Sequence, residues 1–478
     1  MSKEFVKAVL RDLAEAEMPA EKDPWPAIRE RVQAGYSTQK AQKVTLPARQ
    51  RASAPDQPDV RRTVHLQGVS RHRFSTAAAL IVLLALSAGV IAFLAGIVRL
   101  QPSITYGTIP ACWSIVANPN IEGGDTVLIQ ISATSANDVW AVGYSGRAGA
   151  TQTLVQRWDG KEWRTIPSAN VPSRNNYLTG VAALAPDNVW VVGYHCTGNC
   201  SDAAPLIQHW DGGQWNTAPV QEMGRLNGID AVSANDIWVV GYSNEGTISL
   251  HWNGQRWIPV PTNDQSVANR SLMLNAVVAI AADNVWAVGQ EHDTQANSYT
   301  ELIYRWDGAR WTSVAGAGAA QGARLYAVAA TSADDVWAVG DRDINPFAGA
   351  PLETLTQHWD GSTWRDVPSP NIGTGGSYLR GVEAISPTDV WALGGHGPIT
   401  GTKKTLLLHW DGVAWGVVPS PNVEEQSNRF FGVEAISANE IWAVGTFNNT
   451  STGAFVQRYN PCTIATPTPR TLIVPESR

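Results

Sequence analysis

The chain has 478 residues, 44% of them hydrophobic, and a formal net charge of −7. This length can bury one large core or several smaller ones. The chain is rich in Gly (42), Pro (28) and Trp (21), a composition that favours a β-rich repeat protein and argues against a mixed α/β enzyme.

The first 74 residues are basic, with 14 Lys or Arg against 9 Asp or Glu, whereas the remaining residues have 21 against 33. We expect a short helical tail over residues 1–36, because Glu4–Glu17 has helical periodicity and Asp23-Pro24 has the cap and proline of a second helix start. A basic, disordered linker is expected over residues 37–74. The acidic remainder of the chain argues against nucleic acid as a partner.

An apolar segment follows the linker. Residues 77–98 are interrupted only by Ser87, and as a helix of about 1.5 Å per residue they would cross a hydrocarbon layer of roughly 30 Å. We therefore predict a transmembrane helix over residues 75–98. Lys and Arg are frequent before this segment, but after it only Arg99 precedes Arg147. The positive-inside rule then places the N-terminus in the cytoplasm and the rest, after a stalk over residues 99–111, outside the cell. A cleaved signal peptide is the alternative, but more than 70 residues precede the segment, which is too long for a leader.

Residues 112–462 contain seven copies of an apolar strand of the form Asp-Val-Trp-Ala-Val-Gly, most of them followed by Trp-Asp-Gly-x-x-Trp. The copies are 48 to 54 residues apart, which is the period of propeller blades with four strands each. The sequence therefore predicts an all-β fold, a seven-bladed β-propeller. In the third copy we expect the four strands at Leu226–Val232, Asp236–Tyr242, Ile248–Trp252 and Arg256–Pro261, with an Asn-Gly turn of positive φ between the last two. The first tryptophans of the copies are Trp140, Trp190, Trp238, Trp286, Trp337, Trp391 and Trp442.

The seventh copy stops at Tyr459, and its missing end lies far upstream, at Cys112 and Trp113. An N-terminal strand is therefore predicted to complete the last blade and close the ring. We predict a Cys112–Cys462 disulfide in place of the missing turn, worth up to roughly 5–6 kcal/mol in the chain-entropy model. A second disulfide, Cys196–Cys200, would stiffen a loop, and both fit an oxidising space. A disordered C-terminal tail is expected over residues 463–478.

The loops predict which face of the ring is variable. In each blade the turns between the first and second strands and between the third and fourth strands are short and alike, whereas the other connections are long and dissimilar. The variable loops therefore gather on one face, which we call the top face. The stalk is expected to join the opposite, bottom face, so that the top face points away from the membrane.

The repeated strands and turns resemble the bacterial propeller repeats related to the kelch and Asp-box (sialidase-type) groups, over about residues 112–462. Only Gly394-Gly395 supplies the double glycine of a kelch repeat, and the turns match only the latter half of an Asp-box. The resemblance therefore implies a fold that hosts binding proteins and enzymes alike. The order of tail, linker, span and outer domain is similar to the layout of membrane-bound anti-sigma factors; a generic bacterial membrane tail is the alternative.

Positions filled alike in every copy are predicted to be structural. An Asp, Asn or Glu precedes each Val-Trp or Ile-Trp, and we expect it to cap the turn between the first two strands. The tryptophans of the Trp-Asp-Gly-x-x-Trp turns are expected to pack the outer strands, with a sugar-binding platform as the alternative.

The residues that open the first strand of each blade differ from copy to copy and would meet at the mouth of the central channel. Guanidinium groups favour carboxylate, phosphate or sulfate, and aromatic rings favour sugars or peptide. We therefore predict a ligand-binding site on the top face; solvated arginines that balance an acidic ring are the alternative. The predicted site residues are Tyr177, Arg225, Arg324, Tyr326, Tyr378, Arg380, Arg429 and Phe431.

The predicted function is non-catalytic binding of a glycan, cell-wall fragment or protein by a single-pass protein of the cell membrane, whose tail relays occupancy to a cytoplasmic partner. One alternative is a sialidase-like surface hydrolase or lyase, with Tyr177, Tyr378 and Glu383 as candidate catalytic residues. Another alternative is a scaffold for other envelope proteins. No cofactor is predicted, and no metal site, because the histidines lack a metal-ligand spacing.

Overall fold

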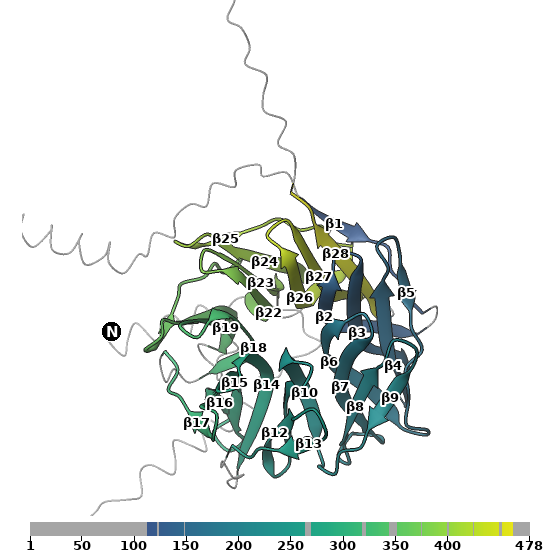
Figure 1. Cartoon of the computed structure of the whole chain (residues 1–478). Coiled ribbons are helices and arrows are strands. Elements are labelled where there is room, and N and C mark those ends of the chain that lie inside the picture. The colour runs from purple at the N-terminus through teal and green to yellow at the C-terminus, as the bar shows by residue number, and fades with distance from the viewer. Residues whose placement is uncertain are drawn as a thin grey trace, which may run out of the picture. The chain divides into compact units, whose positions relative to one another are not determined.

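The computed structural model describes residues 112–461, apart from 122–123, 148, 263–268, 318–321, 344–350, 374, 399–400, 424 and 449–451. These residues form seven sheets of four strands each, arranged as blades around a central channel (Figure 1). The predicted seven-bladed propeller is confirmed. The predicted tail, linker, span and stalk (1–111) and the C-terminal tail (463–478) lie outside the described residues. Within the described part of the chain, no helix has the length and hydropathy needed to cross a membrane.

Each blade runs outward from a long innermost strand to a short outermost strand. Blades 1 to 3 contain β2 (Asp125–Ser135), β3 (Asp138–Arg147), β4 (Ala150–Trp158) and β5 (Trp163–Thr165); β6 (Asn175–Ala185), β7 (Asn188–Cys196), β8 (Ala204–Trp210) and β9 (Trp215–Ala218); and β10 (Arg225–Ser233), β11 (Asp236–Ser243), β12 (Gly246–Trp252) and β13 (Trp257–Pro259). Blades 4 and 5 contain β14 (Arg270–Ala281), β15 (Asn284–Asp293), β16 (Ser298–Trp306) and β17 (Trp311–Ser313); and β18 (Ala323–Ser332), β19 (Asp335–Asp343), β20 (Leu352–Trp359) and β21 (Trp364–Asp366). Blades 6 and 7 contain β22 (Gly376–Ser386), β23 (Asp389–Gly397), β24 (Lys404–Trp410) and β25 (Trp415–Val417); and β26 (Ser427–Ser437), β27 (Glu440–Asn448), β28 (Thr452–Tyr459) and β1 (Trp113–Val116).

The strand predictions for the third blade are confirmed, because each strand begins and ends within two residues of its expected bounds. The turn between β12 and β13 has the predicted positive φ, 86° at Gly254. Asn253 Oδ1 accepts hydrogen bonds from the N–H groups of Gln255 and Arg256 at 3.1 and 3.0 Å, which stabilises this turn.

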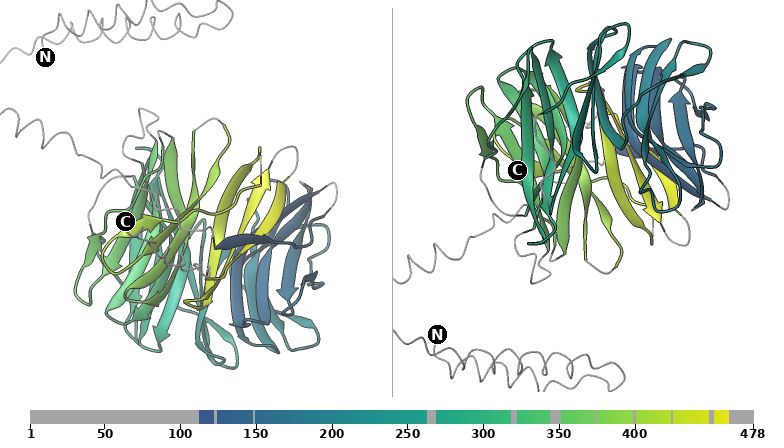
Figure 2. Two further views of the ribbon diagram at one scale, coloured as in Figure 1. Left: turned by 90° about the horizontal axis from the view of Figure 1, so that it is seen from above. Right: turned by 90° about the horizontal axis from the view of Figure 1, so that it is seen from below.

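The ring closes as the sequence predicts. The strand β1 pairs with β28, so that Trp113 lies opposite Tyr459, and Figure 2 shows this N-terminal strand beside the last strands of the chain. The Trp113 ring packs 5.8 Å from that of Trp391 and 5.6 Å from that of Tyr459. Cys112 is disulfide-bonded, but Cys462 lies outside the described residues, so the predicted pairing of these two stays a prediction.

The core of the protein lies between neighbouring blades. The tryptophan on the second strand of one blade packs against the two tryptophans of the next blade's outer turn: Trp140 lies 5.7 Å from Trp210 and 5.9 Å from Trp215, measured between ring centroids. Such aromatic contacts recur around the ring, and in the last blade β1 contributes Trp113 to one of them. The predicted packing role of the paired tryptophans is confirmed.

The carboxylate or amide that precedes each repeated tryptophan has a partner that we did not expect. Asp236 Oδ1 lies 2.8 Å from His251 Nε2, and the His251 ring stacks on Trp238 at 4.4 Å. The side chain thus bonds to the third strand, where each blade has His or Arg. The predicted role at the turn is found only in part: in blades 1 and 5 the carboxylate also accepts a hydrogen bond across the turn, from the hydroxyl groups of Thr134 and Thr331. In five of the seven blades a serine caps the turn, as where Ser233 Oγ accepts a hydrogen bond from the Asn235 N–H at 3.3 Å. The seven pairs are Asp138–Arg157, Asn188–His209, Asp236–His251, Asn284–Arg305, Asp335–His358, Asp389–His409 and Glu440–Arg458.

The last glycine of the repeated strand creates the shape of the channel mouth. In blade 4, a Cβ at Gly289 would overlap the carbonyl oxygen of Met273 on the innermost strand. The glycine lets this strand approach closely, and its register then shifts between Leu274 and Ala276. The bulge places Asn275 in the lining of the channel. The same shift occurs in every innermost strand.

Candidate functional site

The central channel encloses a cavity of about 750 Å³ lined by the innermost strands of all seven blades. Each innermost strand follows a variable loop, so it begins at the top face and runs toward the bottom face. The residues that open these strands therefore surround the mouth of the channel. The residue at each bulge lines the channel next to the mouth.

In three blades the bulge residue bonds to the neighbouring blade. Thr179 Oγ1 donates a hydrogen bond to the Leu226 carbonyl at 2.7 Å, Asn227 Nδ2 to the Leu274 carbonyl at 2.8 Å, and Asn275 Nδ2 to the Leu325 carbonyl at 2.7 Å. These bonds hold blades 2 to 5 together. In the remaining, adjacent blades the bulge residues are Tyr326, Arg380, Phe431 and Ile129. In these four blades the bulge position has a residue other than the Thr or Asn that bonds to the next blade.

Two predicted arginines converge on one buried carboxylate in blades 5 and 6. Asp341, at 0% exposure of its side chain, lies 2.6 Å from Arg324 Nε and 3.0 Å from Arg380 Nη1. The Arg380 guanidinium also lies over the rings of Tyr326 and Tyr378, 3.6 and 4.9 Å from their centroids. The structure therefore brings four predicted residues into one group around Asp341, which fixes the position of Arg380.

Next to this group is a smaller cavity of about 420 Å³, which we call the rim pocket. Its lining combines three basic side chains with aromatic and aliphatic ones: Leu352, Gly376, Tyr378, Arg380, Gly397, Lys403, Arg429 and Phe431. Burial raises the pKa of Tyr378, and the nearby charges of Arg429 and Arg380 oppose this shift. The predicted residues Arg429 and Phe431 thus join the group through the pocket.

The other two predicted residues belong to a separate aromatic cluster. The Tyr177 ring stacks on Tyr194 at 4.8 Å and meets Tyr144 edge-on at 5.0 Å. The Arg225 guanidinium lies 4.8 Å from the Tyr194 centroid and 5.9 Å from that of Tyr242. Burial raises the pKa of Tyr194 to about 12 despite the charge of Arg225. This cluster joins blades 1 to 3 at the mouth.

The predicted disulfide Cys196–Cys200 is confirmed, and its loop adjoins the aromatic cluster. Arg225 Nη2 donates a hydrogen bond to the Cys200 carbonyl at 3.4 Å. The short disulfide loop therefore holds a top-face connection beside one of the predicted site residues.

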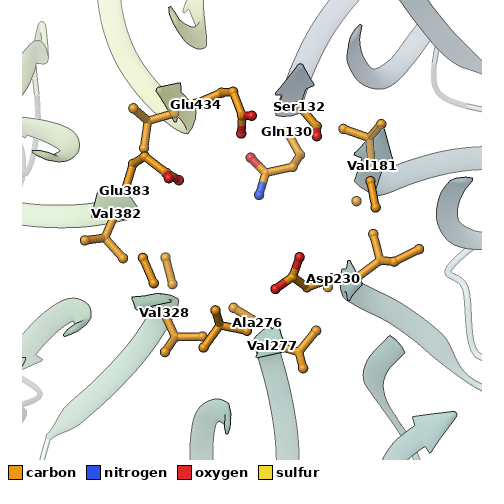
Figure 3. Close-up of a pocket in the computed structure, with 18 of the residues that line it drawn as sticks. Gln130, Ser132, Val181, Asp230, Ala276, Val277, Val328, Val382, Glu383 and Glu434 are labelled. Atoms are coloured by element: carbon orange, nitrogen blue, oxygen red, sulfur yellow. The ribbon is translucent and has the colours of Figure 1, made fainter. Parts of the chain in front are cut away.

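Deeper in the channel, three carboxyl groups point toward the lumen (Figure 3). Asp230 Oδ2 accepts a hydrogen bond from the Ala279 N–H at 2.7 Å, and Glu434 Oε1 accepts one from the Ala133 N–H at 3.1 Å. Burial raises the pKa of Asp230 to about 6 and that of Glu434 to about 8. Burial, together with the charge of Glu434, also raises the pKa of Glu383.

These carboxyl groups share one repeat position, opposite the tryptophan of the second strand. In blade 1 this position is Ser132, whose Oγ likewise accepts an N–H of the next blade, that of Ala183, at 3.1 Å. Side chains at this position therefore bridge neighbouring blades in three places around the ring. This is the structural role that their shared repeat position suggests.

The candidate catalytic residues do not form a single constellation. Tyr378 opens β22 at the mouth, and Glu383 follows five residues later on the same strand, about 16 Å deeper at roughly 3.3 Å per residue. Tyr177 lies in the aromatic cluster, several blades away. Among the described residues, no group of three or more His, Cys, Asp or Glu side chains is arranged to hold a metal ion.

Sequence reasoning missed Asp341, Lys403 and the tyrosines at 144, 194 and 242. Asp341 and these tyrosines follow the repeated glycine of the second strand and lie opposite the residues that open the first strand, as Tyr242 lies opposite Arg225. The signal was present, because this position also differs from copy to copy. Lys403 lies in a connection whose length varies between copies, so the repeat alignment gave no signal for it.

Comparisons with known proteins show no matching family model and no matching curated protein. Among solved structures, YCF48 bound to a D1 peptide has 15% identity and a TM-score of 0.47, and the match covers 75% of this chain and 97% of that chain. An ulvan lyase of a polysaccharide lyase family has 9% identity and a TM-score of 0.49, covering 69% and 91%. A GH74 xyloglucanase from Xanthomonas campestris has 14% identity and a TM-score of 0.47, covering 74% and 54%. Likenesses at this level bear on the fold alone.

Proposed function

We propose that this protein is a membrane-anchored propeller outside the cell that binds a ligand at the mouth of its channel without converting it chemically. One observation carries the proposal. At the bulge position, blades 2 to 4 have small polar residues that bond to the next blade, whereas Tyr326, Arg380 and Phe431 occupy it in blades 5 to 7. A purely structural role gives no reason for large aromatic and basic side chains on one side of the ring only.

The chemistry of the mouth supports binding rather than catalysis. The arginine at the bulge of blade 6 is fixed by Asp341 and by two tyrosine rings, an arrangement suited to recognition. In the aromatic cluster, Tyr177 offers a ring and Arg225 a guanidinium group to other parts of a glycan or protein ligand. The channel carboxyl groups, which a glycosidase or lyase would need, lie deep, and two of the three, Asp230 and Glu434, bridge neighbouring blades.

The location rests on the transmembrane helix predicted over residues 75–98 and on the basic residues that precede it. In this arrangement the tail relays occupancy of the propeller to a cytoplasmic partner. A single span requires dimerisation or a second membrane protein for that relay.

The test is binding of the purified full-length protein, in detergent micelles, to arrays of glycans, cell-wall fragments and peptides. We expect binding that Arg380→Ala abolishes. The control is Arg164→Ala, which removes an exposed arginine of the outermost strand β5, next to the bottom-face turn of blade 1, and should bind like the wild type. Failure of every probe to bind would favour the scaffold alternative.

The same samples test the enzyme alternative. Bound glycans should be recovered intact after prolonged incubation. New reducing ends that disappear in a Glu383→Gln/Glu434→Gln variant would replace our proposal with a hydrolase or lyase acting inside the channel.

A further inference from the structure

We infer that the rim pocket binds the acidic group of a sugar residue, with Arg429 and Lys403 as its main partners and Arg380 as a third. This inference rests on the proposed function and deepens it, because it names the ligand class and the position of the charged group. At about 420 Å³ the pocket is within the usual size range of small-ligand sites. Its lining comes from blades 5 to 7, on the side of the mouth where the bulge residues are large.

The pocket has an excess of positive charge. Its lining includes three basic side chains, and no Asp or Glu is among the described residues that line it. Within the described part of the chain, Arg429 has no carboxylate within ion-pair distance, and its Nε is buried without a hydrogen-bond partner. A buried donor without a partner costs free energy that a bound anion would recover.

Arg380 is positioned in advance for a ligand. Its Nη1 is bonded to Asp341 at 3.0 Å and to the Leu379 carbonyl at 3.2 Å. Among the described residues, its Nε and Nη2 have no such partner, so donors of the fixed guanidinium remain for an anion. Asp341 is therefore a positioning residue: it holds both Arg324 and Arg380, but its single negative charge offsets only one of their two positive charges. The positive charges of Arg429 and Lys403 add to that excess.

The walls favour a sugar over a peptide. The rings of Tyr378 and Phe431 offer apolar surface to the carbon-bound hydrogens of a sugar ring, and the Tyr378 hydroxyl, whose pKa is raised by burial, stays protonated and able to donate a hydrogen bond. A peptide commonly binds by pairing with a free strand edge. Here β22 and β26 are the innermost strands of their sheets, and their unpaired edges run along the central channel. The rim pocket itself is a compact volume of about 420 Å³ lined by side chains, which suits one sugar residue better than an extended peptide.

The test is calorimetric titration of the full-length protein in detergent micelles with four probes. Hexagalacturonate and a chondroitin sulfate hexasaccharide are acidic sugars, maltohexaose is a neutral sugar, and hexaglutamate is an acidic peptide. We expect at least one acidic sugar to bind, more weakly at high salt, and maltohexaose not to bind. Arg429→Gln and Lys403→Gln should each weaken binding at least about tenfold, as expected when a charge-assisted contact is lost.

Arg270→Gln is the matched control. Arg270 opens β14 on the same face, is half-exposed and pairs with Glu291 at 2.9 Å, outside the rim pocket. Its loss should leave binding of the acidic sugar unchanged. Unchanged tryptophan emission in all variants would show that the packing between blades is intact.

A second readout does not depend on the choice of sugar. Sulfate stabilises folded proteins in general by exclusion from their surface, so the readout is the comparison between variants: at equal ionic strength, sulfate in place of chloride should raise the melting temperature of the wild type and of Arg270→Gln more than that of Arg429→Gln. An equal sulfate effect in the wild type and Arg429→Gln, together with no binding of either acidic sugar, overturns the inference. Binding of hexaglutamate alone replaces it with recognition of an acidic peptide. Ligand binding that needs Arg380 but neither Arg429 nor Lys403 overturns the inference while leaving the proposed function intact.

Discussion

Replacing Asp230 with Asn tests whether a channel carboxyl group lowers the stability of the ring at neutral pH. Asp230 accepts the Ala279 N–H of the next blade at 2.7 Å, and an amide oxygen can accept the same hydrogen bond. Burial raises the pKa of Asp230 to about 6, and the hydrogen bonds from the N–H groups of Ala279 and Ala231 oppose this shift only in part. The variant therefore keeps the bridge between the blades and removes only the charge.

The expected magnitude follows from the two pKa values. The unfolded chain loses the Asp230 proton near pH 4, whereas the folded protein loses it near pH 6. Stability therefore falls as pH rises between these values and stays lower above them. A shift of about two units corresponds to ~3 kcal/mol at 1.36 kcal/mol per unit. Because the channel brings water to this half-buried group, we expect about 1–3 kcal/mol.

The assay is thermal unfolding of wild type and Asp230→Asn, followed by tryptophan fluorescence between pH 4 and pH 8. At roughly 2.1 cal/mol/K of unfolding entropy per residue, a ring of about 350 residues should gain about 1–4 °C in melting temperature at pH 8. The gain should grow steeply between pH 4 and pH 6 as Asp230 ionises in the wild type, and more slowly toward pH 8, because the charge of Asp230 also opposes the ionisation of Glu434, whose pKa is raised to about 8. Asp230→Ala, which also loses the acceptor, should have the same pH dependence but be less stable than Asp230→Asn by about 1 kcal/mol.

Two outcomes would refute this reasoning. A gain that does not vary with pH would mean that Asp230 titrates in the folded protein as it does in water. A wild type more stable than Asp230→Asn at pH 8 would mean that the carboxylate contributes more through its charge-assisted hydrogen bond than burial costs it.

Three further substitutions test the closure, the bulge and the mouth. Trp113→Ala removes the ring that β1 contributes to the last aromatic contact and should lower the unfolding free energy by about 3–5 kcal/mol in denaturant titrations; a loss below 1 kcal/mol would mean that β1 does not hold the ring closed. Gly289→Ala places a methyl group on the Met273 carbonyl and should destabilise by about 1–3 kcal/mol in the same assay, whereas unchanged stability would argue against a required close approach. Asp341→Asn frees Arg380 and should weaken ligand binding by about tenfold without changing which ligands bind, a result to be checked by calorimetry; unchanged affinity would mean that Arg380 needs no positioning.

The ring and its closure were predictable because they depend on features that recur in every copy. The period gave the blades, and the incomplete last copy with Trp113 upstream gave the closing strand. The Asn-Gly turn at Gly254 was equally predictable, since a tight turn of positive φ restricts the residue types that fit it.

The partners of the repeated polar residues were not predictable in the same way. The position of Asp236 is polar in every copy, which indicates a structural role but not which strand it faces. His251 on the third strand satisfies it, because pairing of β11 with β12 sets Trp238 opposite His251. Such a register follows only from the folded sheet.

The candidate site was half predictable for a related reason. Arg324 and Arg380 were predictable because they open the first strands of their blades. Asp341, which pairs with both, was not predicted. Asp341 lies on the second strand, opposite Arg324. Residues that vary between copies occur on both the first and the second strand of a blade. A site is therefore predicted more completely when each varying residue is considered together with the residue opposite it on the neighbouring strand.

In a ring of seven copies, stability alone should select the same kind of residue at a given repeat position in every blade. The bulge of the innermost strand is a position where the blades differ. Thr179, Asn227 and Asn275 use the bulge to bond to the next blade, and among the described residues the other four blades lack this bridging hydrogen bond. In blades 5 to 7 this loss is concentrated on one side of the mouth, where Tyr326, Arg380 and Phe431 stand instead. Stability alone favours the bridging residue, and the buried, unpartnered Nε of Arg429 beside these blades adds a further cost. Costs that gather on one side of a symmetrical scaffold are best explained by a ligand that recovers them, which is the strongest physical reason to look for the ligand at the rim pocket.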